Sequence, residues 1–165
     1  ERSRVNEISP TTAFTQVDAI AQFLITAAPE NLDHLKEARK LFEIGLIKIA
    51  ANKRNEQDLD DLRRLLAEQR KELGNAHDFI RGDIAFHSKL ASIAGNPIIT
   101  AMAEAMLKWI FHYHTSLLHW SGREEVTLDE HERIIEAIAA GDSSAAAGMM
   151  EVHLDRSAAN YRHHS

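Results

Sequence analysis

Residues 83–97, which read DIAFHSKLASIAGNP, decide the fold predicted for this chain. Apolar residues recur at helical spacing over residues 84–93 and mark one buried helix face. The stretch closes on Gly95-Asn96-Pro97, in which a glycine typical of a helix C-terminus precedes an asparagine N-cap and a proline that suits the first helical position. The segment therefore predicts a helix, a tight turn and a second helix.

The same pattern extends over the rest of the chain, and no segment is typical of a strand. Seven glycines and three prolines are too few for the many tight turns of an all-β fold. We therefore predict an all-α fold, an antiparallel bundle of about seven helices. The predicted helix starts are Ser9-Pro10, Pro29-Glu30-Asn31, a short loop at Asn52–Asn55, Asn75, Asn96-Pro97, a capping box at Thr127–Glu130 and Gly141-Asp142.

Composition excludes several functional classes. The chain has 165 residues, which suits one domain, and its formal net charge of -6 makes it a poor candidate for coating DNA by itself. The absence of cysteine excludes disulfides, thiolate catalysis and cysteine zinc sites. Its apolar stretches are too short to span a membrane, and no signal-peptide pattern opens the sequence. We expect a cytoplasmic protein.

Histidine is the unusual component, with ten residues against two Trp and two Tyr. Asp83 and His87 stand four residues apart and so share one helix face. His131 precedes the Gly141 turn by ten residues and His153 follows it by twelve, which puts them about 15 and 18 Å from that turn. If they converge with His87 inside the bundle, one carboxylate and three imidazoles form a metal site, because a divalent cation offsets the cost of burying them.

Each of these candidate residues also has a structural interpretation that involves no ligand. A single histidine on a helix is more often solvated or part of the core than a ligand, and Asp83–His87 also fits a simple charge pair. Arg39 and Glu43 form either a surface ion pair or a site in which the arginine binds an effector carboxylate. His112, His114 and His119 lie among aromatic residues and have no assigned role.

The pattern resembles the effector-binding domain of GntR-type bacterial transcription regulators, of the type named FCD after the C-terminal domain of the fatty-acid regulator FadR. The matching residues are Arg39–Glu43, Ala50-Ala51, Asp83, Phe86-His87, Leu90, Gly95-Asn96-Pro97, His131 and His153. Further similarity, at Glu1-Arg2, Asn75-Ala76 and Phe79-Ile80-Arg81, is to the branch that represses sialic-acid catabolism.

This resemblance implies a homodimer whose metal is bound by Asp83, His87, His131 and His153. Such a donor set suits zinc first, with Ni, Fe, Mn or Co as alternatives. We expect a small acidic effector, such as sialic acid or another sugar or hydroxy acid, to contact Arg39 and Asn96. The resemblance also implies that residues 1–9 are a linker remnant and residues 10–165 an effector-binding and dimerisation domain. DNA would be read by an N-terminal winged helix-turn-helix that the chain lacks.

Two other functions compete with this sensor. A mononuclear metal-dependent enzyme usually keeps three protein ligands and an open position, whereas four ligands are assigned here and HExxH is absent. We therefore predict that the chain is not an enzyme. The second alternative is a structural bundle in which the metal only holds helices together. It differs from a sensor because no small molecule other than the metal would stabilise it.

Overall fold

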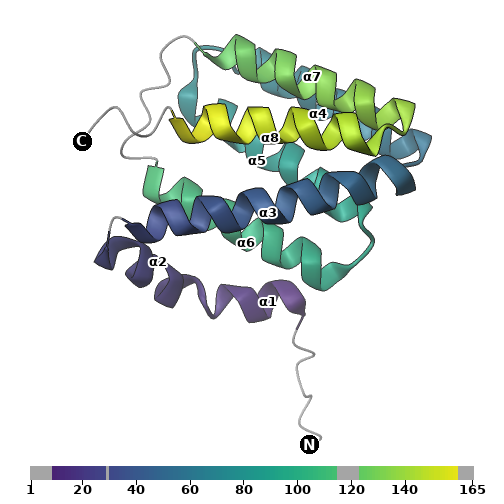
Figure 1. The fold of residues 1–165 in the computed structure, drawn as a ribbon. Coiled ribbons are helices and arrows are strands. Elements are labelled where there is room, and N and C mark those ends of the chain that lie inside the picture. Colours follow the sequence, from purple (N-terminus) through teal and green to yellow (C-terminus); the bar gives the residue numbers. More distant parts are fainter. Residues whose placement is uncertain (1–8, 29, 115–122, 160–165) are drawn as a thin grey trace, which may run out of the picture.

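The computed structural model describes residues 9–28, 30–114 and 123–159, which contain eight helices and no strand. The all-α prediction is thus confirmed for the described part of the chain (Figure 1). The helices are α1 (Pro10–Thr15), α2 (Asp18–Ala27), α3 (Glu30–Lys53), α4 (Glu56–Lys71), α5 (Ala76–Ile93), α6 (Pro97–His114), α7 (Glu124–Ala140) and α8 (Ser143–Ala159).

The eighth helix arises because the first predicted helix is broken in two. Val17 N–H donates to the carbonyl of Phe14 at 3.0 Å, so the chain tightens at the end of α1 before α2 starts at Asp18. Such three-residue hydrogen bonds are typical of helix ends. α1 has no buried residue, so packing does not hold the two segments in one continuous helix.

The capping box predicted at Thr127–Glu130 is wrong. α7 begins one turn earlier, at Glu124, and Thr127 lies fully buried inside the helix. Two acidic residues, Glu124 and Glu125, occupy the first turn, where they interact favourably with the positive end of the helix dipole. Thr127 Oγ1 instead accepts a hydrogen bond from Arg156 Nη2 at 2.9 Å.

Several of the other predicted turns have side-chain caps or glycines at the helix ends, whereas Pro29 of the turn predicted at Pro29-Glu30-Asn31 lies outside the described residues. The side chains of Asn55, Asn75 and Asn96 cap α4, α5 and α6. Gly95 and Gly141 adopt φ values of +72° and +73°, which residues with a Cβ rarely adopt. These short turns make neighbouring helices antiparallel and so fix their register.

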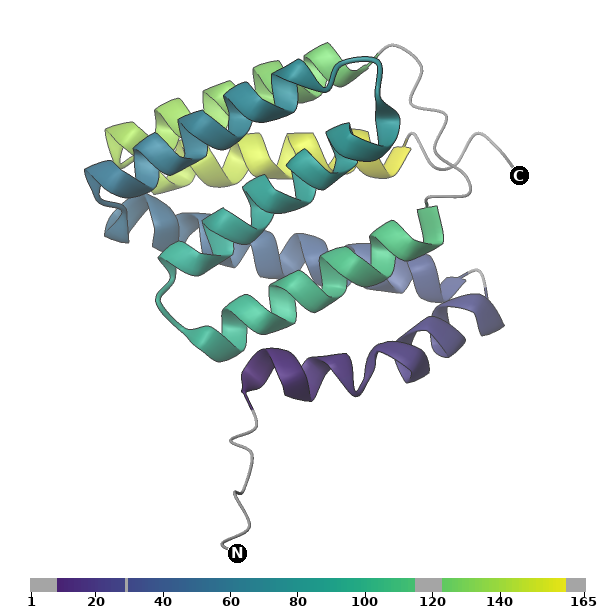
Figure 2. The same cartoon turned by 180° about the vertical axis from the view of Figure 1, so that it is seen from behind.

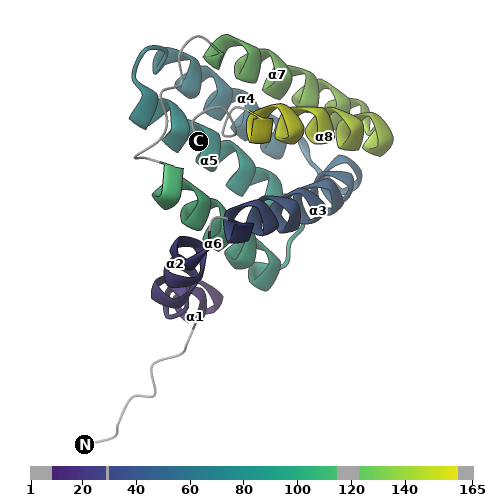
Figure 3. The ribbon, with the colours of Figure 1, turned by 60° about the vertical axis from the view of Figure 1, so that its left-hand side comes forward.

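The helices surround one main core. α3 and α8 pack side by side on one face, with α7 beside α8 (Figure 1), while α4 and α5 lie behind them (Figure 2). α1 and α2 lie at the end of the bundle against α6 (Figure 3). α5 crosses the interior, where it contacts α3, α4 and α6. The largest fully buried apolar side chains are Ile47, Leu62, Phe79, Phe86, Leu128, Ile134, Ile138 and Met150.

Within the described ranges, no helix combines the length and the apolar character that crossing a membrane requires.

Candidate metal centre

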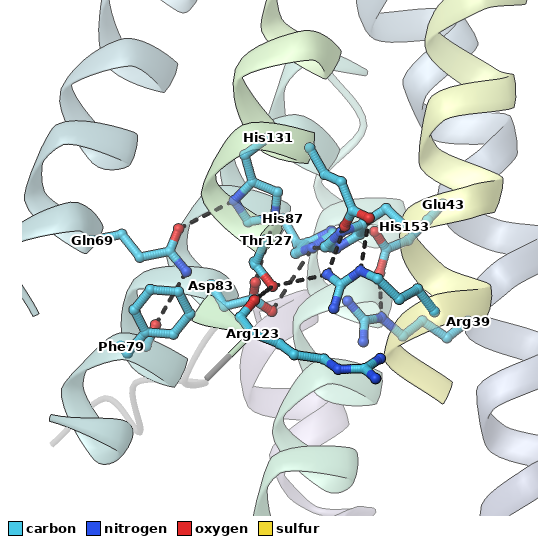
Figure 4. A network of polar contacts seen from close by, with 12 residues as sticks. Arg39, Glu43, Gln69, Phe79, Asp83, His87, Arg123, Thr127, His131 and His153 are labelled. Atoms are coloured by element: carbon cyan, nitrogen blue, oxygen red, sulfur yellow. Dashed lines mark hydrogen bonds and ion pairs between the residues drawn. The ribbon is translucent and has the colours of Figure 1, made fainter. Parts of the chain in front are cut away.

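The structure brings Asp83, His87, His131 and His153 together inside the bundle (Figure 4). The first two lie on α5, and the others come from α7 and α8. One potential ligand atom from each residue lies within 4.8 Å of the other three. The histidines are 2%, 0% and 1% exposed, respectively. A solvated surface position is therefore excluded for all three imidazoles.

The Nε2 atoms of the histidines point toward one another and toward the Asp83 carboxylate. His87 Nε2 lies 3.3 Å from His153 Nε2, and His131 Nε2 lies 3.4 Å from Asp83 Oδ1. His87 Nε2 is 3.9 Å from Asp83 Oδ2, so the helical i,i+4 spacing puts both α5 residues on the same centre.

An oxygen atom from a different side chain faces the Nδ1 atom of each imidazole. His87 contacts Glu43 Oε2 of α3, His131 lies 3.1 Å from Gln69 Oε1 of α4, and His153 lies 2.7 Å from Glu130 Oε2 of α7. Because a carboxylate or amide oxygen only accepts, each Nδ1–H is the donor. A neutral ring then has its Nε2 lone pair directed at the centre.

Burial favours the neutral form of His131 and His153. It lowers the pKa of His131 well below 6.5, and the neighbouring His153 and His87 lower that pKa further. Burial also lowers the pKa of His153, although the hydrogen bond to Glu130 acts in the opposite direction. Neutral imidazoles are the form that binds metal ions.

The cluster leaves hydrogen-bonding capacity unused in the interior. Asp83 Oδ1 and His131 Nε2 are both buried and have no hydrogen-bond partner among the described residues. Unpaired buried polar atoms are costly and are rare in folded proteins. A divalent cation between them would satisfy both atoms, and nitrogen and carboxylate oxygen are donors that such cations accept. The residues present therefore fit a metal ion.

Arg39 and Glu43 form a buried ion pair and not the surface pair that was one of the two interpretations from the sequence. Their side chains are 12% and 8% exposed, and Arg39 Nε donates to Glu43 Oε1. Burial would raise the pKa of Glu43, but Arg39 and His87 hold it well below 4.5. A narrow cavity opens beside this pair, and its lining includes Arg39, Glu43, Leu46, His87, Met106 and Met150.

Asn96, the other residue expected near an effector, lies apart from the cluster. It is exposed at the α5–α6 turn, beyond Ile93, where α5 ends, and nine residues after His87. Its Oδ1 accepts hydrogen bonds from the backbone N–H groups of Ile98 and Ile99, at 3.0 and 3.3 Å. Its observed role is a helix cap.

Sequence reasoning missed three residues around the centre: Gln69, Glu130 and Arg156. Arg156 donates to both Glu130 oxygens, from Nε at 2.7 Å and from Nη2 at 2.6 Å. Burial would raise the pKa of Glu130, but its hydrogen bonds with His153 and Arg156 lower it to about 2. The position of Arg156, three residues after His153, was an available signal. No local pattern points to Gln69.

Of the three unassigned histidines in the aromatic segment, the structure describes the side chain of His112 alone. His112 is exposed on α6. The side chain of His114 and the whole of His119 lie outside the described residues.

Comparison with known proteins assigns the chain to a family. Residues 34–156 match the FCD domain model. Two curated relatives named "HTH-type transcriptional repressor NanR" are each 29% identical to this chain. The match to the Cronobacter sakazakii protein covers 94% of this chain and 60% of the relative. The match to the Escherichia coli K12 protein covers 98% of this chain and 62% of the relative. The chain thus spans about three fifths of these relatives.

Solved structures share the fold. The E. coli McbR/YncC structure has a TM-score of 0.72 at 18% identity and covers 81% of this chain and 65% of its own. The Streptococcus agalactiae GntR structure has a TM-score of 0.69 at 22% identity, and the match covers 78% of this chain and 58% of that chain. The curated relatives are named as transcriptional repressors and not as enzymes. Three quarters of the chain match the family model, and the chain belongs to the FCD domain family.

Proposed function

We propose that this chain is the ligand-sensing domain of a bacterial GntR-type transcriptional regulator. A divalent metal bound by Asp83, His87, His131 and His153 and a small carboxylate effector would together control DNA binding by a part of the regulator outside this chain. The observation that carries the proposal is the buried cluster itself, in which Asp83 Oδ1 and His131 Nε2 have no hydrogen-bond partner among the described residues.

Zinc is the first candidate for the metal, and Ni, Fe, Mn and Co are alternatives that also accept nitrogen and oxygen donors. When bound, the metal supplies positive charge in a buried site and offers a coordination position to an anion. The four side chains come from α5, α7 and α8, so a bound ion would also link three helices.

Arg39 and Arg156 support an acidic effector. Both guanidinium groups approach carboxylates that contact a histidine of the cluster, so positive charge lies close to the proposed metal. Arg156 Nη1 is buried and has no hydrogen-bond partner in the described part of the chain. A carboxylate can accept two hydrogen bonds from one guanidinium. Sialic acid or another sugar or hydroxy acid is the class we favour, through Arg39 and not through Asn96.

Effector binding would act by shifting the balance between two packings of the bundle. An anion that contacts Arg39 of α3 and the centre on α5, α7 and α8 stabilises the arrangement in which these groups lie together. In a cytoplasmic homodimer, that shift would reorient the two DNA-binding parts relative to each other. A purely structural metal would not couple to any effector.

Titration calorimetry of metal-loaded and chelator-treated protein with a panel of sugar acids and hydroxy acids tests the proposal. We expect an acid that binds the loaded protein and binds at least tenfold more weakly after chelation or in Asp83→Ala and His153→Ala. His77→Ala is the matched control because its side chain is 65% exposed. Equal affinity in all these proteins would overturn the proposal, and metal binding without any effector would favour the structural staple.

A further inference from the structure

His87 and His153 each contact a carboxylate that also pairs with an arginine, and His131 does not. Glu43 contacts Nδ1 of His87 and also accepts from Arg39, and Glu130 accepts from Nδ1 of His153 and from Arg156. Each unit is thus a chain of arginine, carboxylate and imidazole. The two units come from different helices, α3 with α5 and α7 with α8.

His131 is held differently. Its Nδ1 faces the neutral amide oxygen of Gln69 at 3.1 Å, and its ring stacks on Phe86 with centroids 4.0 Å apart. An anionic acceptor polarises the N–H of an imidazole more strongly than an amide does, and so increases electron density at Nε2. His87 and His153 are therefore the stronger donors toward the centre.

An arginine pairs with each of the two carboxylates. Arg39 donates to Glu43, and Arg156 donates to both oxygens of Glu130, while the same carboxylates contact the Nδ1 atoms of His87 and His153. These contacts orient the two rings before any cation arrives. Such preorganisation is what makes outer-sphere groups important for metal affinity.

We propose that Glu43 and Glu130 are positioning residues of the metal centre. Each carboxylate fixes the orientation and tautomer of one histidine and so increases its donation to the metal, and its arginine holds the carboxylate in place. This inference rests on the proposed function, because it requires that the cluster bind a metal. It goes beyond that function by assigning metal affinity to residues that never contact the ion.

Titration with Co²⁺, followed by its visible absorption, tests the assignment in the wild type, Glu43→Gln and Glu130→Gln. Each glutamine keeps an oxygen acceptor and removes the charge. We expect the dissociation constant for Co²⁺ to rise by roughly 10–100-fold in both variants, with a shifted absorption band. Glu132→Gln is the matched control: its side chain lies on α7 and is 58% exposed, so its affinity should stay within twofold of the wild type.

Circular dichroism and thermal melting of the metal-free variants separate positioning from loss of fold. If Glu43→Gln does not fold because Arg39 is left buried without its counter-charge, the paired change Arg39→Leu with Glu43→Gln removes both charges and takes its place. Folded variants that bind Co²⁺ within twofold of the wild type would overturn this inference alone. A wild type that binds no Co²⁺ would instead overturn the proposed function.

Discussion

Gly82 of α5 packs directly against the side chain of Gln69 of α4. A Cβ at position 82 would lie 2.8 Å from Gln69 Cγ and 2.9 Å from its Cβ. In this position the Gln69 amide donates to the Phe79 carbonyl at 3.2 Å and faces His131 Nδ1 at 3.1 Å. Close approach of the two helices at a glycine therefore orients a histidine of the candidate metal centre.

Gly82→Ala should displace Gln69 and, through it, His131. We expect a loss of about 1–3 kcal/mol in the free energy of unfolding, because the methyl group overpacks a buried contact. Metal affinity should fall as well. Urea denaturation and metal titration measure the two effects. Gly45→Ala is the control, since nothing lies within 4 Å of a Cβ there. That helical site should gain about 0.5–1 kcal/mol, and a similar gain at position 82 would contradict the packing argument.

Asn96→Ala should weaken the start of α6 and leave effector binding unchanged. Loss of an asparagine N-cap costs about 1 kcal/mol, because two backbone N–H groups lose their acceptor. Thermal denaturation and effector titration of the same variant measure both properties. A normal melting temperature combined with weaker effector binding would indicate that Asn96 contacts the effector and does not stabilise α6 as a helix cap.

Asp18 should make the attachment of α2 to α6 depend on pH. Its Oδ1 accepts from Trp109 Nε1 at 2.8 Å, and hydrogen bonds from Lys108 and Trp109 lower its pKa below 3.8. A carboxyl group whose folded pKa is lowered contributes stability above its unfolded pKa and loses it as the pH falls toward the folded value.

Asp18→Asn measures that contribution. At pH 7 we expect the variant to be less stable by roughly 0.5–1 kcal/mol, since the pair is partly exposed. The difference from the wild type should shrink as the pH falls below about 4. Urea denaturation between pH 3 and pH 7 provides the comparison. A difference that stays constant over this range would show that the charge of Asp18 does not stabilise the fold.

Metal should stabilise the fold through the four-residue cluster. At a free metal concentration 100 times the dissociation constant, binding to the folded state alone adds about 2.7 kcal/mol. We expect Zn²⁺ to raise the melting temperature and a chelator to reverse the change. The shift should be absent in His153→Ala and retained in His77→Ala. Equal shifts in both variants would mean that the metal binds elsewhere.

The helices were predictable where local chemistry defines them. Gly95 and Gly141 at helix ends and asparagine caps such as Asn75 act within a few residues, so sequence alone reveals them. The approach of His131 to His153 was also predictable, because helical rise is regular and both residues are counted from one short turn. The break near Val17 was not, because packing and not local pattern decides whether weakly buried segments form one helix.

The supporting residues of the site lie beyond such reasoning. Gln69 reaches His131 only because α4 crosses α5 at Gly82, and this crossing depends on how the whole bundle packs. The burial of Arg39 and Glu43 likewise depends on which face of α3 meets the other helices. Sequence spacing could indicate that the two residues are neighbours on a helix, but not that they are removed from water.

The metal content and binding stoichiometry of the purified chain test most directly whether Asp83, His87, His131 and His153 bind a metal ion. Calorimetric titration of chelator-treated protein with Zn²⁺, alongside elemental analysis of the protein as purified, should give one high-affinity ion per chain. Asp83→Ala should abolish that site, and the exposed-site variant His77→Ala should retain it. A wild type that binds no Zn²⁺, Ni²⁺, Co²⁺, Fe²⁺ or Mn²⁺, or an Asp83→Ala variant that binds as the wild type does, would contradict the account.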